Sequence, residues 1–286
     1  MCESWQAGVV VFAANPQIWR FQFHPEVWIL IAGVLFLARY AVKVIAPNFV
    51  QPNEEIYTRK NFFAFWAALF ALWFASDWPM HDISEEYLYS VHMVQHMIIS
   101  LIVPPLLLTA LPVWLTKVLF GTFSGDRTFT KRISNPIAAG VCYNLIVIVT
   151  HLPFAVNYSI ESGAFHYFLH LAVFVSSLWM WLPIINPMKE YRISQMVYLF
   201  LMSVVPTVPA GFLTFAGGAL YDAYDHQVRL WGIDITTDQQ LAGLVMKLAG
   251  SIYLWVWIAA RFFQWSRRNQ PEMVLVETKA ENTKVL

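Results

Sequence analysis

Long apolar runs separated by short polar connections are the dominant pattern along this chain. An α-helix needs about 20 mostly apolar residues to cross roughly 30 Å of hydrocarbon. The sequence therefore predicts an all-α integral membrane protein with seven transmembrane helices, at Val27–Ala46, Phe62–Trp78, Tyr87–Leu111, Ile137–Val156, Phe165–Ile185, Ile193–Phe215 and Leu241–Phe263.

Composition agrees with a chain that faces lipid. Of its 286 residues, 58% are hydrophobic and 13% are charged, which leaves too little polar surface for a soluble domain of this size. The apolar run Gly8–Ala14 is too short for a secretory signal, and no basic segment precedes it. We therefore expect an outer tail at residues 1–26, a membrane domain at 27–263 and a polar cytoplasmic tail at 264–286.

Basic residues fall on alternate connections, and this sets the expected orientation. Fifteen of the 18 lysines and arginines lie on one side, against only Arg20 and Arg229 on the other. Because short loops rich in lysine and arginine stay in the cytoplasm, we expect the amino terminus outside and the carboxyl terminus inside the plasma membrane. The outer segments are acidic instead. The basic and acidic sides cancel, so the net charge of the chain is near zero. A net charge near zero argues against a nucleic-acid partner.

All eight histidines fall on the outer side of this topology, and four of them form two pairs. His92 and His96, like His166 and His170, are four residues apart and share one helix face. At a rise of about 1.5 Å per residue, His92, His151 and His170 lie roughly 7–8 Å below the outer surface. Neighbouring antiparallel helices pack together, so these imidazoles are expected to converge. Ionisable residues inside spans are costly, which favours a functional site over packing.

The residues beside the histidines favour copper among the possible metals. Met93 and Met97 directly follow His92 and His96, and imidazole with thioether suits copper, especially Cu(I). Adjacent helix positions point about 100° apart, so each methionine is either a ligand or a core filler. Cys2 and Cys142 form no CxxC motif and lie on opposite sides, which supports neither a thiolate site nor a disulfide.

Two further features are unusual for apolar spans. Lys247 lies inside the last span and should have an acidic or carbonyl partner, or reach outward toward Asp238. Prolines interrupt two other spans. The run VPTVPAG should kink or unwind the sixth span, and Pro104 with Pro105 should bend the third below His96.

Three segments carry a resemblance to a known family. Ser76–Pro112, with its HMVQHM helix, paired prolines and final proline, strongly resembles the signature of the CtaG family of cytochrome c oxidase assembly factors (caa-type). His151–Ile185 resembles the HLP segment of that family with its following HxxxH and W-x-P, and Thr237–Gly250 resembles its DQ-x-x-G-x-x-M block. The likeness extends from about His24 to Arg261. Lys247 departs from the pattern, which usually has an aromatic residue there.

The resemblance implies a seven-span, non-catalytic protein that helps to mature a haem-copper oxidase by supplying copper at the outer face. Its partners would be cytochrome c oxidase subunits and membrane lipids. Carried over by position, the expected metal residues are His92, His96, His151, His166, His170, Met93 and Met97, with Asp238 and Gln239 as second candidates.

Two other classes stay open from the residues alone. Paired imidazoles from two helices could hold a haem in a membrane redox protein or haem b carrier. A di-iron oxygenase is a weaker choice, because it needs carboxylates in the histidine layer and Asp77 is the only plausible intramembrane carboxylate.

Overall fold

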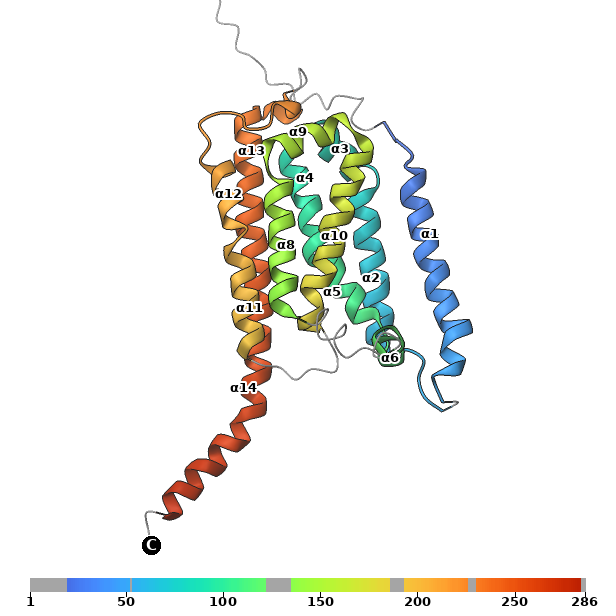
Figure 1. The fold of residues 1–286 in the computed structure, drawn as a ribbon, viewed down its shortest axis with the longest axis vertical. Helices are drawn as coiled ribbons and strands as arrows, with labels where there is room; N and C mark the ends of the chain where they lie inside the picture. The colour runs from blue at the N-terminus through green and yellow to red at the C-terminus, as the bar shows by residue number, and fades with distance from the viewer. Residues whose placement is uncertain (1–19, 52, 122–134, 186–192, 226–229, 284–286) are drawn as a thin grey trace, which may run out of the picture.

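The computed structural model describes residues 20–51, 53–121, 135–185, 193–225 and 230–283, and all regular structure in these residues is helical (Figure 1). Six helical stretches are long and apolar enough to cross a membrane, and a bent pair of helices would form a seventh. The predicted all-α, multi-span architecture is therefore confirmed. The six stretches are Pro25–Asn48, Arg59–Glu86, Tyr89–Ala110, Gly163–Ile185, Ile193–Thr214 and Ile235–Arg267.

Most of these stretches consist of two or three helical segments. The first combines α1 (Pro25–Tyr40) with the short turns η1 (Ala41–Ile45) and η2 (Ala46–Asn48), and it lies at the edge of the bundle in Figure 1. The other segments are α2 (Arg59–Ser76), α3 (Met80–Glu86), α4 (Tyr89–Met97), η3 (Ile98–Ile102), α5 (Val103–Ala110), α6 (Val113–Gly121), α8 (Pro136–Thr150), α9 (Pro153–Glu161), α10 (Gly163–Ile185), α11 (Ile193–Val204), α12 (Thr207–Thr214), η4 (Asp222–Tyr224), η5 (Leu230–Gly232), α13 (Ile235–Leu244), η6 (Val245–Ala249) and α14 (Gly250–Thr283).

The predicted span Ile137–Val156 is broken in the structure. Helix α8 ends at Thr150, α9 starts at Pro153, and the two are bent by 69°. Proline disfavours the helical conformation in the residue before it, and Leu152 accordingly has an extended backbone (φ −73°, ψ 139°). The apolar composition predicts a continuous span here, but the helix is interrupted before Pro153, and His151 lies at the bend.

Proline also shapes the third span, as expected. The π-helical turn η3 directly precedes Pro104 and Pro105 in α5. Pro104 has no N–H to bond the carbonyl of Ser100 four residues earlier, so that carbonyl needs other donors. Ser177 Oγ and Trp181 Nε1 of α10 donate to it. The Ser100 carbonyl therefore links the span that carries one histidine pair to the helix that carries the other.

The sixth and seventh spans also depart from single straight helices. The chain breaks between α11 and α12, where Pro206 and Pro209 lie, as the VPTVPAG run predicts. The last helix, α14, continues to Thr283 and extends beyond the bundle in Figure 1, whereas the apolar run predicts a span that ends at Phe263. Cys142 is a half-buried residue of α8, and Cys2 lies outside the described residues.

Candidate metal centre

Three helices bring the histidine pairs together at one end of the bundle. His92 and His96 lie on α4, His166 and His170 lie on the first two turns of α10, and α3 packs beside them. Asp238 of α13 fixes the start of α4, because its carboxylate accepts hydrogen bonds from the backbone N–H groups of Tyr89 (2.7 Å) and Ser90 (3.0 Å). These first-turn donors have no partner within their own helix.

The two histidine pairs form one compact cluster, as the sequence predicts. The ring centroids of His92 and His96 are 4.4 Å apart, and those of His166 and His170 are 4.3 Å apart. Between the helices, the His170 ring lies 4.8 Å from His96 and 5.6 Å from His92. One ligand atom from each of His92, His96 and His170 falls within 4.8 Å of the others, a spacing that a single metal ion could bridge.

A carboxylate that the sequence analysis missed lies against this cluster. Glu85 Oε1 of α3 is 3.2 Å from His92 Nδ1, 3.2 Å from His166 Nε2 and 3.9 Å from His170 Nε2. Glu85, His166 and His170 also have ligand atoms within 4.8 Å of one another. The sequence indicates Asp77 as the only plausible carboxylate within the membrane, whereas Glu85 lies in one of the acidic outer segments.

The contact with Glu85 sets the chemistry of His92. A carboxylate accepts the proton of Nδ1–H, which leaves the lone pair of the neutral ring on Nε2. Metal-binding histidines commonly have a carboxylate or carbonyl on the second nitrogen in this way. His92 is therefore held in the tautomer that a metal ligand requires.

His151 lies beside the cluster and has the same tautomer for a different reason. Its Nδ1 donates to the carbonyl of Val147 at 2.7 Å, which leaves Nε2 free. The His151 ring is 6.3 Å from the His96 ring, and His151 belongs to neither group of converging ligand atoms. Tyr221 Oη donates to the His151 carbonyl at 2.7 Å; burial raises the pKa of Tyr221 to about 12, so this hydroxyl keeps its proton.

A small cavity continues from the cluster toward the middle of the bundle. It has a volume of about 30 Å³ and is lined by His96, His151, Met97 and Lys247, among other residues. Met93 is fully buried in the hydrophobic core instead. The two methionines therefore have different surroundings, and only Met97 shares a cavity with histidines.

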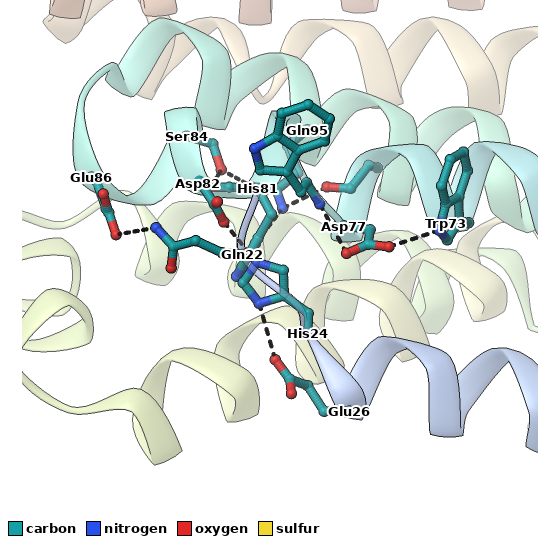
Figure 2. A network of polar contacts seen from close by, with 12 residues as sticks. Gln22, His24, Glu26, Trp73, Asp77, His81, Asp82, Ser84, Glu86 and Gln95 are labelled. Atoms are coloured by element: carbon teal, nitrogen blue, oxygen red, sulfur yellow. Dashed lines mark hydrogen bonds and ion pairs between the residues drawn. The ribbon is translucent and has the colours of Figure 1, made fainter. Parts of the chain in front are cut away.

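Two other histidines, His24 and His81, belong to a polar network beside the cluster (Figure 2), and the His81 ring lies 6.4 Å from the His166 ring. His24 Nε2 is 2.7 Å from Asp82 Oδ1, and its Nδ1 is 3.4 Å from Glu26 Oε1. Gln95 Nε2 donates to the Ala75 carbonyl and also lies 3.2 Å from His81 Nδ1, so that nitrogen of His81 is an acceptor and Nε2 carries the proton. Carboxylates engage both ring nitrogens of His24, and Gln95 engages Nδ1 of His81, which favours a structural role for the two residues.

The remaining expected residues also have structural partners. Asp77 accepts from Trp73 Nε1 (2.8 Å) and from the backbone of Trp78 (2.9 Å). Gln239 accepts from the backbone N–H of Leu220 and Tyr221 and donates to the Tyr221 carbonyl. Asp238 and Gln239 therefore support the helices around the cluster and lie in neither group of converging ligand atoms.

Lys247 has a hydroxyl partner where we expected a carboxylate or a carbonyl. Its Nζ donates to Thr207 Oγ1 at 2.6 Å, at the break between α11 and α12. Asp238, toward which the lysine was expected to reach, accepts hydrogen bonds from the start of α4 instead. The ammonium therefore lies at the edge of the cavity, where Thr207 rather than Asp238 is its partner.

Comparison with known proteins gives one match. The family model described as "Cytochrome c oxidase caa3 assembly factor (Caa3_CtaG)" matches residues 49–268, which include the whole histidine cluster. Searches of curated proteins and of solved structures gave no significant match.

Proposed function

Because the chain belongs to the family of cytochrome c oxidase caa3 assembly factors, we propose that it binds copper at the outer face of the plasma membrane and passes the ion to an oxidase subunit. An assembly role suggests a non-catalytic protein whose partners include oxidase subunits. Its apolar helices place it in a membrane as a multi-pass protein.

The convergence of His92, His96 and His170 is the observation that carries this proposal. Their three ligand atoms lie within 4.8 Å of one another, and Glu85 holds His92 in the ligand tautomer. Imidazole nitrogens suit copper, zinc, iron and nickel alike, so the choice of copper rests on the family and on Met97 at the adjoining cavity. Three neutral imidazoles bind copper less tightly than four thiolates would, which suits an ion that must be released.

The size of the adjoining cavity weighs against the haem alternative. Its volume of about 30 Å³ has room for about two water molecules, far less than a porphyrin needs. An absorption spectrum of the purified protein separates the two functions. We expect no Soret band, and a strong one would favour the haem b carrier.

The direct test is the copper content of the purified full-length protein and of a His92→Ala/His96→Ala double variant. We expect the double variant to lose bound copper and oxidase maturation but to remain in the membrane, because the apolar spans still insert. His24→Ala is the matched control and should have a smaller effect, since carboxylates engage both ring nitrogens of His24. Normal copper content and oxidase activity in the double variant would disprove the metal site.

A further inference from the structure

Two overlapping groups of ligand atoms share His170, and we propose that they are two successive positions of one copper ion. The outer position is formed by Glu85, His166 and His170, and the inner position by His92, His96 and His170. The ion is first held at the outer position and then moves to the inner one by exchange of ligands around His170. This inference rests on the proposed function, because it assumes that copper is the ion bound.

Buried nitrogens without hydrogen-bond partners mark the outer position. Among the described residues, His166 Nε2 and His170 Nε2 are both buried and lack a hydrogen-bond partner. Glu85 Oε1 lies 3.2 Å from His166 Nε2 and 3.9 Å from His170 Nε2, but it satisfies neither nitrogen with an aligned hydrogen bond. A buried polar atom without an aligned partner is costly, and an ion ligated by these three side chains would lower that cost.

His170 cannot serve both positions at the same time. A neutral imidazole has one nitrogen with a lone pair, while the other nitrogen carries a proton. One ion at a time can therefore bind His170, so the two positions exclude each other. The protein should bind one copper ion at saturation, although it has ligand atoms for two sites.

The chemistry of the two positions gives the movement a direction. The outer position contributes a carboxylate oxygen, which is a poor ligand for Cu(I), whereas the inner position contributes three imidazole nitrogens. His166 also lies one turn nearer the start of α10 than His170, and His96 lies one turn deeper along α4 than His92. Copper from outside would thus meet the weaker position first and the stronger position second.

The experiment measures both the rate and the extent of Cu(I) uptake by the full-length protein in detergent. Cu(I) is presented under reducing conditions as a coloured chelator complex, and the loss of colour is followed in time. His166→Ala removes a ligand of the outer position only, so uptake should slow by about tenfold while the final stoichiometry stays at one ion. His96→Ala should instead keep rapid uptake and bind Cu(I) about 10- to 100-fold more weakly.

Tyr167→Phe is the matched control, because Tyr167 is next to His166 but points to the surface, where its hydroxyl contacts Glu26. Its uptake should equal that of the wild type. Two bound ions per wild-type chain, an unchanged rate in His166→Ala, or complete loss of copper from folded His166→Ala would overturn the two positions but leave copper binding intact. A wild-type protein that binds no Cu(I) would overturn the proposed function as well.

Discussion

At the scale of single residues, Glu85 is the side chain that organises the histidine cluster. It contacts three imidazoles on two helices, whereas its neighbour Glu86 points away and accepts from Gln22 Nε2 at 3.3 Å. A carboxylate behind a ligating histidine fixes the ring and raises the basicity of the nitrogen that binds the metal. The difference between two adjacent glutamates therefore offers a sharp test.

Glu85→Gln should lower copper affinity by about 10- to 100-fold, because the neutral amide no longer holds His92 Nδ1–H as a charged acceptor does. Glu86→Gln makes the same chemical change one position away and should leave copper affinity unchanged. Competition with a Cu(I) chelator measures both variants. Equal affinities for Glu85→Gln and Glu86→Gln would show that Glu85 does not act on the metal site.

Lys247 provides a second test, since its partner is the hydroxyl of Thr207 rather than a carboxylate. A positive charge at the edge of the cavity opposes a copper cation. Lys247→Met keeps a similar volume without the charge, so membrane insertion should stay intact and copper affinity should rise by up to about tenfold. Equilibrium dialysis against Cu(I) measures this change. Loss of oxidase maturation as complete as in His92→Ala would mean that the lysine has a role in chemistry or docking.

The residues of the site were predictable where local spacing determines position. A separation of four residues places both members of a histidine pair on one helix face in any helical context, so the pairs His92/His96 and His166/His170 follow from the sequence. Their meeting depends on how the helices pack, and His151, which was expected to converge with them, belongs to neither group of ligand atoms. Glu85 was missed because its direction depends on the turn between α3 and α4, where Leu88 is extended (φ −132°, ψ 115°). Hydropathy alone does not reveal that turn.

At the scale of helices, prolines decide where the spans bend and which carbonyls become free. The break before α12 was expected from the sequence, but the break at Pro153 was not. The difference lies in the surroundings: VPTVPAG combines two prolines with a glycine, whereas Pro153 is a single proline in an apolar run. A single proline is tolerated in some spans, and Pro183 lies inside α10 without ending it.

Close packing of α12 against α13 predicts a strong effect of a small substitution. A Cβ atom on Gly243 would lie 2.5 Å from Thr214 Oγ1 and 2.7 Å from the Ala210 carbonyl oxygen. Gly243→Ala should therefore lower the free energy of unfolding by about 1–3 kcal/mol, because the two helices must separate. The melting temperature in detergent reports this change.

Gly211 of α12 is the control for that substitution, since nothing lies within 4 Å of a Cβ built there. Gly211→Ala should leave the melting temperature unchanged or raise it slightly, because alanine restricts the unfolded chain more than glycine does. A melting temperature for Gly243→Ala equal to that of Gly211→Ala would contradict the tight contact between α12 and α13.

At the scale of the whole molecule, the histidines among the described residues lie toward one end of the bundle. Helices α3 and α9 lie at this end in Figure 1, and α14 projects from the opposite end. The apolar runs predicted the helices because length and composition are sufficient to identify a span. Which end of the bundle faces outward depends on the membrane, and the distribution of basic residues is the basis for assigning it.

The orientation can be tested by labelling single cysteines in a variant that lacks Cys2 and Cys142. Glu161 and Asp222 are exposed near the histidine end, and Glu54 is exposed in the connection between α1 and α2 at the other end. Basic residues gather on the connection between α1 and α2, so we expect that end of the bundle to face the cytoplasm. Cysteines at positions 161 and 222, at the opposite end, should then react with an impermeant thiol reagent added outside intact cells. A cysteine at position 54 should react only after the membrane is permeabilised. Labelling of position 54 in intact cells, with protection of positions 161 and 222, would invert the topology and place the copper site on the cytoplasmic side, where it could not receive copper from outside.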